Sequence, residues 1–214
     1  MENPPDPKKI WDERYLRLSK GNARPKSQDW LSRWRYLLDT SGNNPILDIG
    51  CGIGLDSEYL TDQGYKVIAL DYSLAALKLT CRAVEKARLA QVDIRKNFPF
   101  RDSAFQIIIS NLCLHYFNWN KTLAIVEEIH RILKPGGYLV ARFNSTKDMH
   151  YGAVGHAEIE PDYYSVFGMG KRFFNKANLE ELFKNQWEFL SLEESTIQRY
   201  EKPKVVCETV LKRL

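Results

Sequence analysis

The sequence of 214 residues has little cysteine and no apolar run that approaches the length of a membrane span. Its four cysteines, Cys51, Cys81, Cys113 and Cys207, lie far apart without a C-x-x-C pair, which argues against a zinc knuckle and a disulfide framework. The first residues also lack the apolar core of a signal peptide, and a membrane span needs roughly 20 apolar residues. We therefore expect a cytoplasmic protein with reduced thiols and no membrane partner.

The charge balance is close to even. Lys and Arg number 31 against 27 for Asp and Glu, and the two signs are interspersed along the chain. Such a weakly basic balance does not by itself indicate a nucleic-acid partner, so we do not expect one. Hydrophobic residues make up 44% of the chain, which is enough for one sizeable core and predicts one large domain with appendages.

Two helices are predicted before the main domain, within residues 1–44. Trp11, Tyr15 and Leu18 recur at i, i+4 and i+7, which predicts a short amphipathic helix with one aromatic face. A second helix, with Ser27 as its N-cap, is predicted from the apolar residues Trp30, Trp34, Leu37 and Leu38. We expect these helices to cover the binding site described below.

Strands and helices alternate with short links in the main domain, residues 45–214. The predicted strands cover 46–49, 66–70, 88–92, 105–110 and 138–143, and the predicted helices cover 55–63, 73–84 and 121–133. Continuous apolar strands such as Ile107-Ile-Ile109 indicate a parallel sheet with helices on both faces, which is the α/β class. A helix over 177–184 and two strands over 188–192 and 205–211 follow, and the two strands are expected to pair at the sheet edge.

The segment from 144 to 174 fits neither the helical nor the strand period and is too long for a simple connector. Insertions of this length are often functional, so we predict a substrate lid here. The side chains expected to wall the substrate site are His150, Tyr151, His156, Tyr163, Tyr164 and Arg172. The spacing H-x5-H-x-E matches no strong ligand pattern, and we therefore expect no metal site.

A glycine-rich turn, Asp48-Ile-Gly50-Cys51-Gly52-Ile-Gly54, follows the first strand of this domain. Open parallel sheets bind ligands at the carboxyl ends of their strands, and glycine lets the backbone approach a ligand closely. The dinucleotide fingerprint would need glycine at position 55, where Leu55 stands. The carboxylate of Asp48 would repel a pyrophosphate and attract a ligand with an ammonium and a sulfonium, and S-adenosylmethionine is such a ligand.

Two further acids follow the next predicted strands. Asp71, 21 residues after Gly50, is placed to accept hydrogen bonds from both hydroxyls of a ribose. Tyr72 could lie against adenine, and Asp93 could accept from its exocyclic amine. Each acid alone is explained equally well as an exposed turn or capping residue. Three acids at three successive strand ends together favour a nucleoside-bearing cofactor.

The chain resembles the class I S-adenosylmethionine-dependent methyltransferases, and most of all their small-molecule branch with tellurite-resistance-type and thiopurine-type enzymes. The segments that carry the resemblance are Ile46–Gly54, Val67–Ser73, Phe98–Phe100, Ser110–Tyr116, Leu133–Gly137 and the helix with Trp11-Asp-Glu-Arg14-Tyr15. The resemblance implies a Rossmann-like sheet of seven strands, mostly parallel, with the last strand antiparallel.

The resemblance also implies roles for individual residues. It places Gly50 and Gly52, with Cys51 between them, against the methionine part of the cofactor and Asp71 against the ribose. It places Asp93 and Ile94 at the adenine, the backbone at Asn111 and Leu112 at the amino-acid end, and Arg14 and Tyr15 at the cofactor carboxylate. Gln106 departs from the family, where an acidic residue often enters the fourth strand.

Methyl transfer is an in-line displacement at an activated carbon, so positioning supplies much of the rate and a general base is optional. His115, just past the fourth strand, is the candidate base, and a structural histidine is an equally good interpretation. We expect a small-molecule acceptor. The sequence leaves open which acceptor atom is methylated and which oligomeric state the protein adopts.

Three other functions agree with parts of the sequence. A nucleic-acid (RNA) methyltransferase acting on exocyclic amines often carries D/N-P-P-Y/F after the fourth strand, where Ser110-Asn-Leu-Cys113 stands here. A regulatory protein that binds S-adenosylmethionine without catalysis would need no base. A dehydrogenase is a more distant alternative because the turn lacks the dinucleotide spacing.

Overall fold

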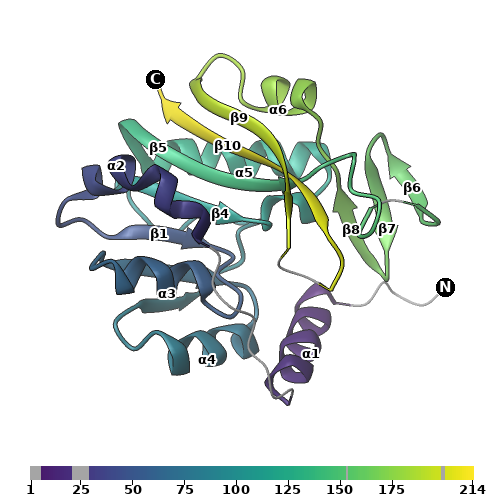
Figure 1. Ribbon diagram of the computed structural model, residues 1–214, viewed down its shortest axis with the longest axis horizontal. Coiled ribbons are helices and arrows are strands. Elements are labelled where there is room, and N and C mark those ends of the chain that lie inside the picture. Colours follow the sequence, from purple (N-terminus) through teal and green to yellow (C-terminus); the bar gives the residue numbers. More distant parts are fainter. Residues whose placement is uncertain (1–5, 21–28, 153, 199–200) are drawn as a thin grey trace.

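Seven strands form one sheet in the order β3-β2-β1-β4-β5-β10-β9 (Figure 1). The computed structural model describes residues 6–20, 29–152, 154–198 and 201–214. The first five strands of the sheet are parallel, and β10 is antiparallel to both β5 and β9. The bounds are β1 Ile46–Ile49, β2 Val67–Asp71, β3 Arg88–Gln91, β4 Phe105–Asn111, β5 Leu133–Asn144, β9 Trp187–Ile197 and β10 Lys204–Arg213. The predicted α/β fold with seven strands and an antiparallel last strand is confirmed.

Helices cover both faces of this sheet (Figure 1). Their bounds are α1 Pro7–Ser19, η1 Asp29–Trp34, α2 Arg35–Leu38, η2 Asp39–Ser41, α3 Leu55–Asp62, α4 Leu74–Ala83, η3 Leu114–Tyr116, α5 Trp119–Ile132 and α6 Lys176–Leu182, where η marks a 3-10 helix. Successive residues of a strand point to opposite faces, and Ile108 accordingly joins one hydrophobic cluster while Ile107 and Ile109 join the other.

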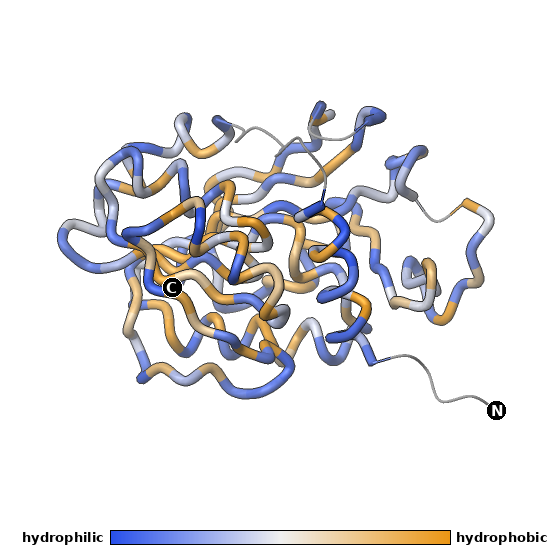
Figure 2. Tube along the Cα trace, turned by 90° about the horizontal axis from the view of Figure 1, so that it is seen from below, coloured by the Kyte–Doolittle hydropathy of each residue, from blue (hydrophilic) through white to orange (hydrophobic). Residues whose placement is uncertain are grey.

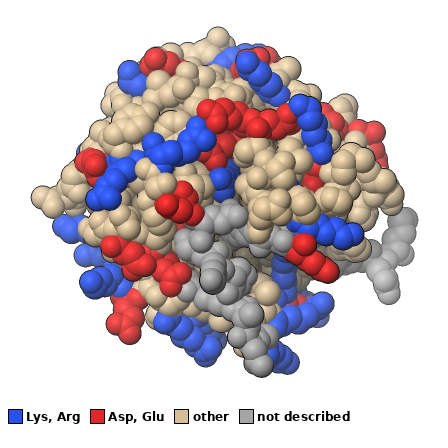
Figure 3. Space-filling model, viewed as in Figure 1, with Lys and Arg blue, Asp and Glu red and all other residues tan. Residues whose placement is uncertain are grey.

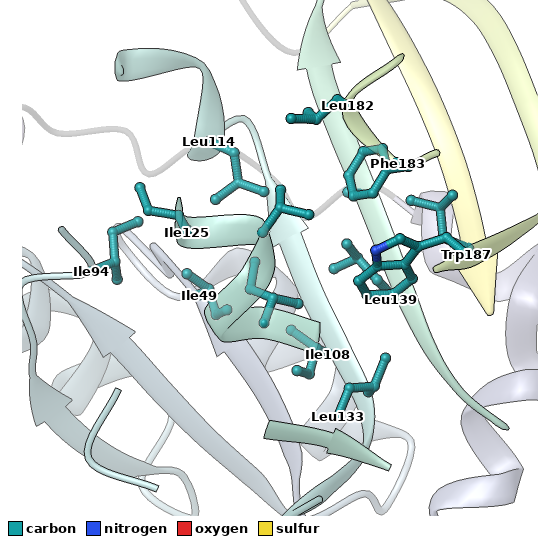
Figure 4. Close-up of a cluster of buried hydrophobic side chains, with 14 of the residues drawn as sticks. Ile49, Ile94, Ile108, Leu114, Ile125, Leu133, Leu139, Leu182, Phe183 and Trp187 are labelled. Carbon is teal, nitrogen blue, oxygen red and sulfur yellow. The ribbon is translucent and has the colours of Figure 1, made fainter. Parts of the chain in front are cut away.

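The cluster that contains Ile108 also receives α5, α6 and the start of β9. Figure 4 shows Phe183 and Trp187 packed beside Leu139, with Ile108 and Ile49 further along the same layer. Apolar segments accordingly gather inside the molecule in Figure 2, whereas Figure 3 shows acidic and basic side chains mixed over one face. No helix in the described ranges has the length and apolarity that crossing a bilayer requires.

The second predicted helix differs from the prediction. Ser27 lies outside the described residues, and residues 29–41 form η1, α2 and η2, so only four of them are α-helical. The apolar pattern did identify the buried side, because Trp30, Trp34, Leu37 and Leu38 are all buried. Both indoles in addition reach carboxylates on distant segments: Trp30 donates to Asp56 and Trp34 to Glu208. Local periodicity does not report such long-range hydrogen bonds.

The insertion is more ordered than its sequence suggests. It contains a three-stranded antiparallel sheet, here called the small sheet, with β6 Ala157–Glu160, β7 Tyr163–Val166 and β8 Met169–Arg172. Each strand has four residues, and the pairing of β6 with β7 shifts register between Glu158 and Glu160, which conceals the two-residue period. The end of the insertion is held by Phe173 and Phe174, which are both buried.

The boundary before the fifth strand also differs. Residues 134–137 were expected to end the preceding helix, but β5 already begins at Leu133, which pairs with Phe105 before a shift in register. The irregular pairing lets a Pro-Gly-Gly segment lie within the strand.

Candidate cofactor pocket

A pocket of about 460 Å³ opens at the carboxyl ends of the parallel strands. Its walls come from the strand ends of the main sheet, from α1 and from the small sheet. The lining residues are Pro7, Trp11, Tyr15, Gly50, Asp71, Tyr72, Val92, Asp93, Ile94, Arg95, Leu112, Cys113, Tyr116, Phe117, Asn118, Lys121, Tyr163, Gly168, Met169 and Gly170. Segments from the first and the last third of the chain therefore meet here.

Gly50 is the residue of the glycine-rich turn that lines this pocket, and Gly52 is not part of the lining. Gly50 and Gly52 have φ values of 71° and 58°, which an L side chain adopts only with strain. A Cβ at Gly50 would collide with the thiol of Cys113, and a Cβ at Gly52 would lie 3.0 Å from the hydroxyl of Tyr15. Because neither residue has a side chain, Cys113 and Tyr15 can approach the backbone of the turn closely.

Asp71 holds the turn and lines the pocket at the same time. Its two carboxylate oxygens accept hydrogen bonds from the amides of Gly52 and Ser73, each at 2.8 Å. Burial raises the pKa of Asp71, and these backbone hydrogen bonds act in the opposite direction. The carboxylate is therefore fixed in direction, and its remaining lone pairs are available to a ligand.

Asp48 and Cys51 lie beneath the turn rather than in the lining. The carboxylate of Asp48 is buried and accepts a 2.6 Å hydrogen bond from the hydroxyl of Ser57. Burial and then the charge of Asp48 raise the pKa of the Cys51 thiol. Burial also raises the pKa of Cys113, with Asp71 and Asp48 adding to it, so both thiols stay protonated and are poor nucleophiles.

The third predicted acid, Asp93, is paired within the pocket wall. Its two oxygens accept from the Nε and Nη2 atoms of Arg95 at 2.8 and 2.9 Å. Burial alone would raise the pKa of Asp93, but the hydrogen bonds and charge of Arg95 hold it below its usual value. Arg95 also lies over the ring of Tyr72, 4.9 Å from its centroid. Arg95 was not among the predicted site residues, although its position two residues after Asp93 is a local signal.

Of the two residues predicted at the end of β4, Leu112 lines the pocket and Asn111 does not. Leu112 lines it and has a φ of 55°, and its amide donates to the carbonyl of Arg142 at 2.9 Å. The side chain of Asn111 instead donates to Asp56 at 2.8 Å and does not line the pocket.

Helix α1 closes the pocket from the opposite side. Asp12 attaches it to the start of α4 by accepting hydrogen bonds from the hydroxyl of Ser73 and the amide of Ala75. Trp11 and Tyr15 face inward, and Trp11 contacts the edge of Tyr116 with 4.8 Å between ring centroids. Burial, followed by the charge of Asp71, raises the pKa of Tyr15, so its phenol is protonated. Arg14, by contrast, is exposed and not part of the lining.

His115 lies in η3, directly behind the lining residue Tyr116. Its side chain is 1% exposed, and its Nδ1 atom has no hydrogen-bond partner among the described residues. Burial, then the charges of Lys171, Lys204 and Arg14, lower its pKa well below the usual value. The imidazole is therefore neutral at pH 7, and it lies in the wall rather than in the lining.

The residues predicted for the lid are only partly brought together. Tyr163 lines the pocket, and Arg172 stacks behind it, 5.1 Å from the Tyr163 ring and 5.5 Å from that of Trp119. His150, Tyr151, His156 and Tyr164 do not line the pocket. Gly168, Met169 and Gly170, which the sequence analysis did not single out, do line it. In the described part of the chain, no group of three or more His, Cys, Asp or Glu side chains is arranged to hold a metal ion.

The chain is similar to known methyltransferases in sequence. Residues 47–141 match the model of a methyltransferase domain. The demethylmenaquinone methyltransferase of Renibacterium salmoninarum is 36% identical over 116 residues, which cover 50% of this chain and 46% of that protein. A malonyl-[acyl-carrier protein] O-methyltransferase of Coxiella burnetii is 32% identical over 142 residues, covering 62% and 47%. The chain thus spans about half the length of the curated relatives it matches.

The fold comparison agrees with the sequence match. The crystal structure of an S-adenosylmethionine-dependent methyltransferase from Anabaena variabilis superimposes with a TM-score of 0.69, covering 100% of this chain and 98% of that one, at 16% identity. Residues 47–141 therefore match a methyltransferase domain in sequence, and the chain has the fold of the class I S-adenosylmethionine-dependent methyltransferases.

Proposed function

We propose that this protein is an enzyme that transfers the methyl group of S-adenosylmethionine to a small-molecule acceptor. One observation carries the proposal. Within a matched methyltransferase domain, Gly50 of the glycine-rich turn and the fixed carboxylate of Asp71 line the same pocket, and the amide of Gly52 donates to that carboxylate. This arrangement suits a cofactor with a ribose and a cationic amino-acid part, because a buried carboxylate attracts cations and accepts from hydroxyls.

The residues fit the cofactor as follows. The methionine part would lie on the turn at Gly50, Cys51 and Gly52, with the amino-acid end near the backbone at Asn111 and Leu112. The buried carboxylate of Asp48 would support the cationic end through its charge. Asp71 would accept from the ribose hydroxyls, and Tyr72, Asp93 and Ile94 would surround the adenine. Tyr15, from α1, would approach the cofactor carboxylate with its phenol, and Arg14 would act there through its charge.

The acceptor would enter between α1 and the small sheet. Aromatic residues from three segments, Trp11, Tyr116 and Tyr163, line this part of the pocket and offer flat apolar surfaces to a small molecule. In this proposal α1, from the predicted covering segment 1–44, covers the cofactor, whereas η1, α2 and η2 contribute no residue to the lining. The described residues of 144–174 form the substrate lid. A cytoplasmic location remains a prediction.

The bound cofactor supplies a methyl group already activated by the sulfonium. The chain's own part is then to hold the acceptor in line with that group and to exclude water, which supplies much of the rate. We propose His115 as the group that accepts a proton from the acceptor where one must be lost, because its imidazole is neutral and its Nδ1 is unpartnered within the described residues.

The first test measures the binding of S-adenosylhomocysteine by calorimetry. We expect binding of this ligand and none of NADH, with turnover of a labelled methyl group into a metabolite extract and not into RNA. Asp71→Ala is expected to weaken the affinity about 10- to 100-fold, because about 1–3 kcal/mol is lost with a buried acceptor. Asp62→Ala, at the exposed end of α3, is the matched control and should bind like the original protein. Equal affinity of Asp71→Ala would remove Asp71 from the site.

A further inference from the structure

Three basic side chains from distant parts of the sequence lie in one region beside the pocket. They are Arg14 of α1, Lys171 of β8 and Lys204 at the start of β10, here called the basic cluster. Two of them contact Tyr151, since Nζ of Lys171 donates to its carbonyl and Nζ of Lys204 lies 5.3 Å from its ring centroid, and η3 with His115 packs against β8. The charges of Lys171, Lys204 and Arg14 all act on His115, and the charges of Lys204 and Arg14 also act on Lys171. Figure 1 shows α1, β8 and the beginning of β10 converging in this region.

A carboxylate beside the basic cluster, that of Asp148, is already paired with one of the lysines. Asp148 accepts a 2.8 Å hydrogen bond from Nζ of Lys204, and the two side chains are 0% and 5% exposed. Its other oxygen faces the amides of His150 and Tyr151. The pair of Asp148 and Lys204 is therefore neutral overall. Arg14 is exposed to solvent, so Lys171 is the cation that a further anion would balance.

Lys171 has only uncharged partners within the described residues. Its Nζ donates to the carbonyl of Tyr151 at 2.6 Å and lies 5.1 Å from the centroid of the Phe173 ring. Burial, and then the charge of Lys204, lower the pKa of Lys171 to about 7. The charge of Asp148 acts in the opposite direction, but that carboxylate is already paired with Lys204. A mostly buried ammonium that has no carboxylate of its own among the described residues is unfavourable, and an anion beside it would relieve that cost.

His115 provides a second, independent sign of a missing ligand group. Its Nδ1 is buried without a hydrogen-bond partner among the described residues, and the imidazole lies close enough to the cluster to be affected by all three cations. A buried polar atom normally has a partner, so an unpartnered nitrogen at this place indicates that a polar group completes the site.

The basic cluster adjoins the acceptor side of the pocket. Arg14, His115 and Lys171 each have a chain neighbour in the pocket lining, namely Tyr15, Tyr116 and Gly170. The side chains of Arg14, His115, Lys171 and Lys204 are not themselves part of the lining, so an acceptor would have to extend past Tyr116 and Gly170 to reach them.

We propose that Lys171 and Lys204, with Arg14 and His115 beside them, bind an anionic group on the methyl acceptor, either a carboxylate or a phosphoryl group. This inference rests on the proposed function, because it names the substrate class for the same site. The anionic group would be held at the cluster while another atom of the acceptor, or an oxygen of the anion itself, faces the methyl donor.

The test uses the full chain saturated with S-adenosylhomocysteine, and calorimetry with four probes. Acetate and benzoate represent carboxylates, phenyl phosphate represents phosphoryl groups, and benzamide is the uncharged analogue of benzoate. We expect at least one anionic class to bind about tenfold or more tightly than benzamide. We also expect Lys171→Met to lose about 10- to 100-fold of that affinity, the range for a hydrogen bond to a charged group, and Lys171→Arg to restore most of it.

Lys184→Met is the matched control, because Lys184 is an exposed lysine paired with Glu181 of α6, outside the insertion. It should bind the anions unchanged. Lys171→Met removes no partner of a buried carboxylate, and the affinity for S-adenosylhomocysteine reports whether each variant is folded. Failure to bind S-adenosylhomocysteine at all would count against the proposed function. Normal binding of it, combined with anions that bind no more tightly than benzamide or with Lys171→Met equal to the original protein, would overturn this inference alone.

Discussion

At the scale of single residues, the protonation state of His115 determines whether its imidazole can act as a base. Burial and three nearby cations lower its pKa well below the usual value, so it is already neutral at pH 6.5 and above. If it accepts a proton from the acceptor, kcat/KM should stay level above pH 6.5 and fall only in more acidic solution. His115→Asn should lower kcat by about 10²- to 10⁴-fold, as for loss of a general base, with little change in the affinity for S-adenosylhomocysteine.

Steady-state kinetics across pH measure both effects. His150→Asn, at an exposed position of the insertion, is the control and should keep the original kcat. A kcat for His115→Asn close to that of the original protein would show that the histidine has no part in proton transfer.

The residues that sequence reasoning identified are those whose place is set by local order along the chain. Gly50, Asp71 and Asp93 each end or follow a strand, and parallel strands bring such ends to one edge of the sheet. Arg95 and Lys171 were not assigned a role, because what they do depends on partners. Arg95 lies over the ring of Tyr72, and burial and then the charge of Lys204 lower the pKa of Lys171. Both interactions form only when separate segments pack together.

At the scale of elements, the 3-10 segment η1 is attached to the sheet through a buried ion pair. Arg142 and Glu208 pair at 2.8 Å with side chains 7% and 4% exposed, and Trp34 also donates to Glu208. Glu208→Gln should lower the free energy of unfolding by about 3–5 kcal/mol, because it leaves a buried guanidinium without its counter-charge.

The nearby Glu193 offers a matched comparison, since it pairs with Arg33 at the surface with both side chains about half exposed. Glu193→Gln should change the free energy of unfolding by less than about 1 kcal/mol. Chemical denaturation of both variants measures the difference. Equal losses of the free energy of unfolding in the two variants would show that burial does not make the pair of Arg142 and Glu208 more stabilising than an exposed pair.

The small sheet can be removed as a unit because its two ends lie close together. Lys171 donates to the carbonyl of Tyr151, so a short Gly-Ser linker could replace residues 152–170. The variant should bind S-adenosylhomocysteine with nearly the original affinity, since the turn and Asp71 remain. It should lose methyl transfer, since Tyr163 and the segment from Gly168 to Gly170 no longer wall the acceptor side.

Calorimetry and an assay with the labelled cofactor test these two expectations separately. Retained turnover would show that the small sheet is not the substrate wall. The sequence located this segment but did not reveal its strands, because four-residue strands with a register shift carry too little alternation to be recognised. Strands of the main sheet such as β1 and β4 were recognised because their apolar runs are continuous, although β1 also has only four residues.

At the scale of the whole molecule, the net charge of +4 conceals how the charges are placed. Most basic residues are exposed, but Lys171 and Lys204 lie inside, and the pKa of each is lowered chiefly by burial. These two lysines should therefore give the free energy of unfolding a pH dependence that composition alone would not suggest.

Whether the free energy of unfolding rises or falls with pH depends on whether the folded or the unfolded state binds more protons. The pKa of Lys171 is about 7 in the folded protein and about 10.5 in the unfolded chain, so between these values the unfolded chain binds more protons and the free energy of unfolding rises with pH. His115 acts in the same direction, but only below about pH 6.5. The raised thiol pKa values of Cys51 and Cys113 act in the opposite direction, and only above about pH 9.

The window from pH 7 to 9 therefore isolates the buried lysines. We expect the free energy of unfolding to rise there by about 1 kcal/mol per pH unit, measured by chemical denaturation at constant ionic strength. Lys171→Met should remove most of this rise. Lys147→Met should keep it, because the ion pair with Glu194 raises the pKa of Lys147 and moves its titration above the window. A flat profile for the original protein would mean that the ammonium of Lys171 is already balanced by a group of the protein itself, and the case for an anionic acceptor would lose its electrostatic basis.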